Sequence, residues 1–169
     1  MAVPQDARHI AAGDGGFVPQ HANNWIIEIA GLEGDDRDLL VLSLHSSNLP
    51  TESNNVVEVP YGNQVRKVAG KQIFEDIPLI VKDFVDRETR DAVRRWRRQV
   101  SDPVTGNVGL PSDYKKKADM ILQATNGTSL RTIPLVGVWP SEYNGGALDM
   151  ESDEQVLIEL TLTYDRVDE

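Results

Sequence analysis

The feature that most constrains the fold of this chain is a strict alternation of apolar and polar residues near its carboxyl end. Successive side chains of a β-strand point to opposite faces of the sheet, so a period of two predicts a strand with one buried and one wet face. The apolar positions are Val156, Ile158, Leu160, Leu162 and Tyr164. The water-facing positions are Glu159, Thr161, Thr163 and Asp165. The chain is therefore expected to build a sheet that is covered on one side only.

Other apolar segments rich in β-branched residues predict further strands. The pairs Gly62-Asn63 and Asn126-Gly127 are typical of hairpin turns. A polar stretch at 46–55 is predicted to be a loop without regular structure. The expected strands cover residues 24–30, 39–45 (with Leu40, Leu42 and Leu44 on one face), a hairpin at 56–69, and residues 74–85, 114–124 and 129–139. Because no strand–helix–strand alternation occurs, we expect a mainly β fold: an antiparallel β-sandwich or small β-barrel with one packed α-helix.

That helix is predicted from the stretch "DRETRDAVRRWRRQV", residues 86–100, which has a helical period. At 100° per residue its apolar side chains gather around Trp96, and its arginines lie on the other side. The residues on the Trp96 side are Thr89, Ala92, Val93 and Val100, of which Val93 and Val100 join Trp96 as the expected core anchor. Asp86 is the predicted N-cap. The stretch holds six arginines and three acids, which gives it a charge of +3. Since the whole chain has a net charge of −10, the other residues sum to −13.

Composition and motifs argue against several classes of protein. The absence of cysteine removes disulfides, thiolate catalysis and the common zinc sites. No apolar run approaches the ~18 residues of a membrane span, and the first residues lack a signal-peptide pattern, so we expect no membrane association. Asp149, Glu151 and Asp153 have calcium-loop spacing, but Glu154 and Leu160 stand where glycine and a bidentate acid are needed. We expect no enzyme, no cofactor and no metal. Residues 1–20, rich in Ala, Gly, Asp and Pro, are expected to form a flexible N-terminal arm.

The order of these pieces resembles one known family. A first strand and a long polar loop are followed by "EVPYGNQVRKVAGKQIFEDIPLIVKDFVDRETRDAVRRWRRQV", and "VGVWPSEYNGGALDMESDEQVLIELTLTYDRV" comes later. This pattern, from about Trp25 to Val167, is similar to the tail tube proteins of contractile-tailed bacteriophages. Type VI secretion and contractile injection system tube proteins belong to the same fold group. The resemblance implies a tail tube domain at 21–169, whose hexameric rings stack into a hollow tube inside a contractile sheath.

The resemblance also implies partners and surfaces. The partners would be further copies of the chain, the sheath protein, baseplate and tail terminator proteins, and a tape measure protein in the lumen. DNA would pass through during ejection without specific binding, in a virion tail assembled in the host bacterial cytoplasm. The candidate inter-ring contacts are Ser46, Ser47, Asn48, Thr51, Glu52, Tyr61 and Asn63. The candidate outer-surface or sheath contacts are Arg87, Arg90, Arg94, Arg97 and Arg98. The water-facing set Glu159, Thr161, Thr163 and Asp165 is the candidate lining of the lumen.

Three alternatives stay open at the level of sequence. The first is the tube protein of a contractile injection or type VI secretion system instead of a phage. The second is a nucleic-acid-binding β-barrel that uses the arginines of 87–98 together with Lys115–Lys117. The third, an enzyme or small-ligand binder, has no candidate set of residues.

Overall fold

A computed structural model of the chain describes residues 20–32, 34–86 and 88–168. The predicted flexible arm at 1–20 lies outside the described residues except for Gln20, and so do Arg87 and the last residue. The strands are β1 (Trp25–Ala30), β2 (Leu44–Ser47), β3 (Glu52–Tyr61), β4 (Gln64–Phe74), β5 (Ile77–Lys82), β6 (Lys116–Gln123), β7 (Ser129–Asn144), β8 (Leu157–Thr163) and β9 (Arg166–Val167). The helices are α2 (Asp36–Ser43), α3 (Thr89–Val100) and α4 (Pro111–Tyr114).

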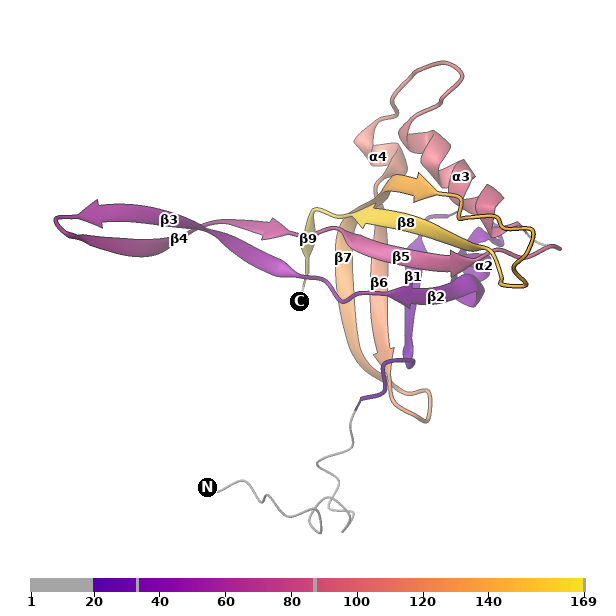
Figure 1. Cartoon of the computed structure of the whole chain (residues 1–169), viewed down its shortest axis with the longest axis horizontal. Coiled ribbons are helices and arrows are strands. Elements are labelled where there is room, and N and C mark those ends of the chain that lie inside the picture. Colours follow the sequence, from indigo (N-terminus) through magenta and orange to yellow (C-terminus); the bar gives the residue numbers. More distant parts are fainter. Residues whose placement is uncertain (1–19, 33, 87, 169) are drawn as a thin grey trace, which may run out of the picture.

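Seven strands form one antiparallel sheet in the order β1-β6-β7-β8-β5-β2, with β9 beside β7. The long strand β7 pairs with β6 and β9 through its first half and with β8 through its second half. The sheet therefore divides into two layers that share β7, and Figure 1 shows the two sets of strands running in different directions. β1 and β2 are the two ends of this order, so each leaves one edge unpaired among the described strands.

The core lies between these layers, and the predicted alternation of the last strand is confirmed. Ile158, Leu160, Leu162 and Tyr164 are buried, and Glu159 and Asp165 are exposed. The same alternation buries Ile77, Leu79 and Val81 of β5 and Ile27 and Ile29 of β1. The mainly β, antiparallel architecture is thus the one that the sequence pattern predicted.

The arginine-rich helix packs on the sheet as its period predicts. Ala92, Val93, Trp96 and Val100 are all buried. The Trp96 indole Nε1 donates a hydrogen bond to the backbone oxygen of Tyr114 at 2.9 Å, so α4 is bound to the anchor side chain of α3. The predicted N-cap is wrong by two positions, because Glu88 precedes the first helical residue and Asp86 lies outside the helix.

Two other expectations are wrong. Residues 39–45 form most of helix α2 and only the start of β2, and not one strand. Leu39, Leu40 and Ser43 are buried at helical spacing, whereas Leu42 is 71% exposed, so Leu40, Leu42 and Leu44 do not share a face. The described residues therefore hold three helices instead of one. The loop predicted at 46–55 is also shorter, because β2 runs to Ser47 and β3 begins at Glu52.

Candidate functional site

The most exposed part of the structure is the β3–β4 hairpin, which projects away from the body (Figure 1). Every residue of β3 is exposed, and in β4 only Gly70 and Phe74 are half-buried. Its ten-residue strand gives the hairpin a length of ~30 Å at about 3.4 Å per residue. The hairpin predicted at 56–69 is confirmed and is longer than expected. We call residues 52–74 the arm.

The root of the arm is fixed to the core. The rings of Phe74 and Tyr164 pack with centroids 5.7 Å apart, and the backbone N–H of Glu75 donates to the Thr51 oxygen at 3.1 Å. Burial of Tyr164 and the neighbouring carboxylates of Glu52, Asp76 and Glu75 raise the pKa of its phenol. The arm is therefore held at a defined angle and is not a loose loop.

Both faces of the arm carry apolar side chains. Residues directly opposite each other in an antiparallel pair share a face. The register places Val57, Val59, Tyr61 and Val68 on one face and Val56, Pro60, Val65 and Ala69 on the other. Tyr61, at the tip, is 82% exposed. A two-stranded hairpin is marginal in water by itself, and contiguous exposed apolar surface marks an interaction site. The arm therefore has the character of a docking element.

The seven residues predicted for inter-ring contact do not form one patch. Tyr61 and Asn63 lie at the tip of the arm, and Thr51 and Glu52 lie at its root. Ser46, Ser47 and Asn48 belong to the edge strand β2 and the segment after it, where the Ser47 hydroxyl donates to the Pro78 oxygen at 2.9 Å. The hairpin 56–69 as a whole was also a candidate for inter-ring contact from the sequence, but its valines, in "VVEVP" and "VRKV", were not named individually.

Several arginines of α3 are used inside the subunit. Arg90 lies 3.5 Å from Asp83, Arg95 forms a two-bond ion pair with Asp36, and Arg97 Nη1 donates to the Pro140 oxygen at 2.8 Å. Arg94 and Arg98 are exposed and form no ion pair within the described ranges. Arg87 is outside those ranges. Of the predicted outward-facing set, Arg94 and Arg98 are thus exposed, Arg90 and Arg97 make contacts within the subunit, and Arg87 is not tested.

One of the three lysines after α4 is paired within the subunit. Lys115 forms an ion pair with Asp165 at 2.7 Å, and β6, which begins at Lys116, lies between β1 and β7. Next to this pair, Gly137 has φ +73°, and a β-carbon there would lie 2.2 Å from Asp165 Oδ2. The bulge of β7 between Val136 and Val138 therefore favours a residue without a side chain.

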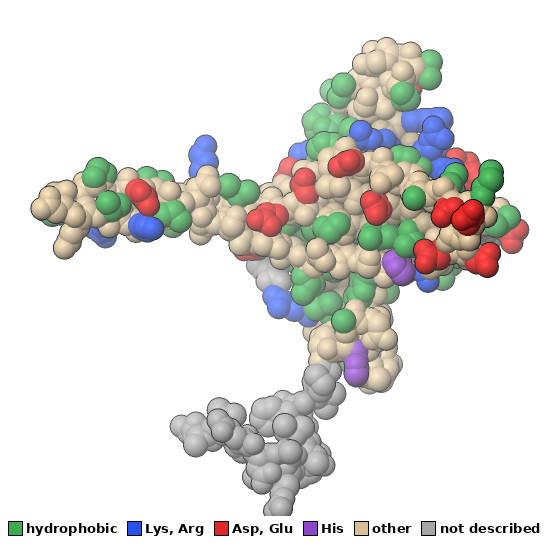
Figure 2. Space-filling view, in the orientation of Figure 1, with side chains coloured by type: hydrophobic (Ala, Val, Ile, Leu, Met, Phe, Trp, Pro, Cys, Tyr) green, Lys and Arg blue, Asp and Glu red, His purple; other side chains and the backbone are tan. Residues whose placement is uncertain are grey.

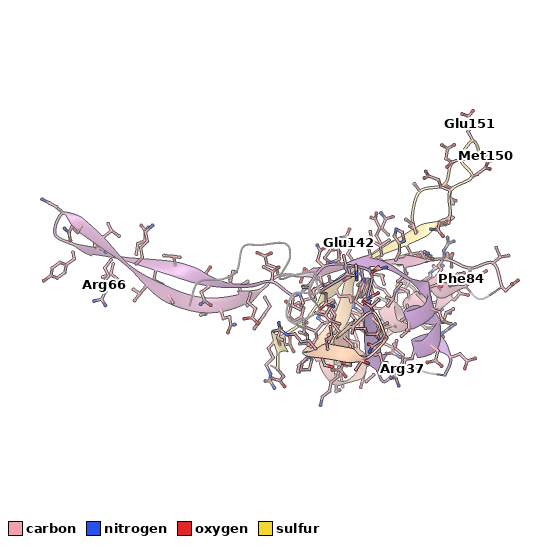
Figure 3. The ribbon with its side chains drawn as sticks, turned by 90° about the horizontal axis from the view of Figure 1, so that it is seen from below. Arg37, Arg66, Phe84, Glu142, Met150 and Glu151 are labelled. Atoms are coloured by element: carbon pink, nitrogen blue, oxygen red, sulfur yellow. The ribbon has the colours of Figure 1, made fainter. Side chains whose placement is uncertain are left out.

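The outer face of β8 is polar. Glu159 accepts a hydrogen bond from the Asn144 side chain at 3.2 Å, and Thr161 lies between Pro78 and Glu142 in neighbouring strands. Thr161 and Thr163 are half-buried, and Asp165 is exposed but is neutralised by Lys115. This face, with Glu142 labelled in Figure 3, presents hydroxyl, amide and carboxylate groups to solvent.

A second exposed apolar region lies at the end of the body opposite the arm (Figure 3), and we call it the far end. Its exposed apolar residues are Leu42 and Phe84, which line a hollow together with Leu39 and Asp86, and Val85, which is 99% exposed. An adjoining hollow is lined by Leu39 and Val85, by the cation Arg95, and by the acids Asp35, Asp36, Asp86, Glu88 and Asp91. Figure 2 shows acidic side chains gathered at this end. Sequence reasoning missed this surface because its residues come from α2 and from the segment between β5 and α3.

The described residues contain no cluster of His, Asp or Glu able to hold a metal ion. None of the helices in the described ranges is long and apolar enough to cross a membrane. The candidate surfaces among the described residues are the arm, the two unpaired sheet edges, the polar face of β8, the exposed arginines of α3 and the far end.

A two-layer antiparallel fold with a projecting hairpin and two unpaired edges is the fold of contractile injection system tube proteins. The tube-terminating cap of the anti-feeding prophage superposes with a TM-score of 0.71 at 19% identity, covering 94% of this chain and 96% of that chain. A sheath-tube complex of an extracellular contractile injection system in its extended state gives 0.68 at 18% identity, covering 98% and 97%. The sheath/tube terminator of such a system gives 0.67 at 19% identity, covering 90% and 96%.

The family is established by sequence. Residues 22–168 match the model of the family described as T4-like virus tail tube protein gp19. The chain therefore belongs to the tail tube protein family, whose members are structural components of a tail or injection particle. No curated protein sequence matches the chain.

Proposed function

We propose that this chain forms hexameric rings that stack into the tube of a contractile tail, with residues 21–169 as the tube domain. The observation that carries the proposal is the projecting arm, apolar on both faces, on a body whose sheet ends in two unpaired edges. A single copy leaves all of these surfaces exposed.

Ring closure accounts for the unpaired edges. An exposed strand edge offers free N–H and C=O groups, which favour pairing with another chain, and a closed barrel removes every edge. β1 and β2 stand at opposite ends of the strand order, so the edge of one copy can meet a different edge of the next. Such a heterologous contact generates a ring when the rotation closes.

The polar face of β8 suits the lumen in this proposal. Glu159 and Glu142 would place carboxylates on the inner wall, with Thr161 and Thr163 between them. Carboxylates repel phosphates, so DNA would slide through the bore without adhering. The overall charge of −10 agrees with a wall that does not bind nucleic acid.

The outer partners follow from the same placement. Arg94 and Arg98 are exposed on α3, and Arg97 keeps part of its surface accessible, so this face would meet the sheath. Baseplate and terminator proteins would cap the two ends of the tube, and a tape measure protein would fill its lumen during assembly in the host cytoplasm. The matched structures include a sheath-tube complex and a sheath/tube terminator, which supports partners of these kinds.

Two tube systems fit this role. The family model is that of a virus tail tube, which favours a phage tail that ejects DNA, and the superposed structures belong to injection systems. The nucleic-acid-binding alternative loses support, because Arg90, Arg95 and Arg97 make contacts within the subunit. The proposed role is structural and non-enzymatic.

Negative-stain electron microscopy of the purified protein tests the proposal. We expect six-fold rings or hollow tubes at high protein concentration or after addition of tail nuclei. A matched variant in which residues 56–69 are replaced by a short Gly-Ser turn should stay monomeric with its core folded. Monomers of the unaltered chain under every nucleating condition would contradict the proposal, as would rings formed equally well without the arm.

A further inference from the structure

We infer that the arm of one copy docks on the far end of the next copy around the ring. The inference rests on the proposed function, because it assigns the partner surface of the arm within the ring. It follows from three properties of the described residues: their positions, their charges and their exposed apolar side chains.

The arm and the far end of one copy are too far apart to meet each other, so a contact between these two surfaces has to join two copies. The arm and the far end lie at opposite ends of the molecule, as the labels Arg66 and Phe84 in Figure 3 show. The arm points away from the body, and its root is fixed by Phe74 and Tyr164. It therefore does not reach its own far end, whereas the far end of a second copy is available to it. Two different patches that meet head to tail have the geometry that closes a ring.

The charges of the two surfaces are opposite. The arm carries Arg66, Lys67 and Lys71 on β4 and Glu52 and Glu58 on β3, so three cations and two acids leave it a net charge of +1, and Lys67 is paired with Glu58 at 3.5 Å. Among the described residues, the two hollows of the far end are lined by the acids Asp35, Asp36, Asp86, Glu88 and Asp91 and by the cation Arg95, which is paired with Asp36. Figure 2 shows basic side chains together with acidic ones along the arm, and acidic side chains gathered at the other end. Opposite potentials steer association and fix the register of an interface.

The apolar side chains also match. The tip of the arm presents Tyr61 beside Val59, and the far end offers an apolar hollow whose lining includes Leu42 and Phe84. Aromatic anchors that enter a hollow near the centre of an interface supply much of its binding energy. Surrounding carboxylates would then meet Arg66 at the rim. Both surfaces lose exposed apolar area in a single contact, which explains why the subunit alone keeps them uncovered.

Cysteine cross-linking tests the contact, because the chain contains no cysteine of its own. The variant Asn63→Cys/Val85→Cys places one thiol at the arm tip, where it leaves the Tyr61 side chain in place, and one at the far end. Each single variant is a control, and Asn63→Cys/Leu130→Cys is the matched pair, since Leu130 is an exposed residue of β7. A short bis-maleimide is added to assembled samples that are imaged in parallel.

We expect rings in the images and a ladder of linked oligomers up to the closed ring for the Val85 pair, with no ladder for the Leu130 pair. Rings without a ladder for the Val85 pair would overturn the inference and leave the proposed function intact. Absence of rings from the unaltered chain would overturn the proposed function, and the inference with it.

A charge exchange provides a second readout that does not depend on thiols. Arg66→Glu alone and Asp86→Lys alone should each raise the protein concentration needed for ring formation by roughly two- to fivefold, the range of one exposed ion pair. The double variant should return to the original concentration, since it restores opposite charges. Additive losses in the double variant would contradict the contact.

Discussion

Replacing Gly137 by alanine is the sharpest test of how β7 serves two layers of sheet. Gly137 has φ +73°, a conformation that an L-residue adopts at a loss of about 1–2 kcal/mol. Its new β-carbon would also lie 2.2 Å from Asp165 Oδ2, so the carboxylate must move and its ion pair with Lys115 must break. Both partners of that pair are partly exposed, so its loss adds only about 0.2–1 kcal/mol.

The expected destabilisation of Gly137→Ala is therefore about 1–3 kcal/mol, with the value at the upper end if the Asp165 backbone shifts as well. Gly127→Ala is the matched control, because Gly127 has φ +81° and nothing lies within 4 Å of its β-carbon. The control should lose only the backbone part, about 1–2 kcal/mol.

Urea unfolding followed by circular dichroism measures both variants, at protein concentrations below assembly so that mass action does not enter. Asp165→Ala should bring the loss from Gly137→Ala down to that of the control, since the colliding carboxylate is gone. The reasoning fails if Gly137→Ala destabilises no more than Gly127→Ala, or if Asp165→Ala brings no relief.

Three further variants test the core, the root of the arm and the arm itself. Trp96→Phe removes the indole bond to the Tyr114 oxygen and should lower the free energy of unfolding by about 1–3 kcal/mol, whereas Arg98→Ala, at an exposed position of the same helix, should change it by less than about 0.5 in urea titrations. Tyr164 has a raised pKa, so the folded state holds its phenol proton more tightly than the unfolded state; its stabilising contribution is complete below the ordinary value of 10.0 and is lost as pH rises through the folded pKa. Tyr164→Phe should accordingly flatten the alkaline loss of stability, and an unchanged pH profile would contradict the assignment. Val59→Glu should abolish rings in electron micrographs while the urea midpoint of the monomer stays unchanged, because the side chain contributes nothing to the core of its own subunit.

The strands and the main helix could be predicted from the sequence because each has a clear period. The last strand alternates without an exception from Ile158 to Tyr164, and the anchor side of α3 follows from the spacing of Val93, Trp96 and Val100. The strand predicted at 39–45 was wrong because the leucines of this stretch fit both the period of a strand and that of a helix. The acids Asp36 and Asp38 in the first helical turn, which favour a helix through its dipole, were the signal that decides between the two.

The candidate site was less predictable, because its contacts join distant segments. That α3 turns arginines outward follows from its period, but that Arg95 meets Asp36 or that Arg97 reaches the Pro140 oxygen does not. The far end likewise combines α2 with the segment before α3. Only the packing of α2 beside α3, which the strand prediction for 39–45 ruled out, brings those residues together.

The arm was predicted as a hairpin, but its exposure could not be predicted, and the reason bears on function. Valines on both faces normally indicate a strand buried between two layers. The core is complete without the arm: β5, β7 and β8 are already covered by their own opposite layer and by α3. No described element is left to cover Val57 or Val65. In the proposed assembly the second layer for the arm comes from another molecule, and a chain whose other exposed surfaces include two sheet edges and an acidic apolar end offers that layer most directly as a copy of itself.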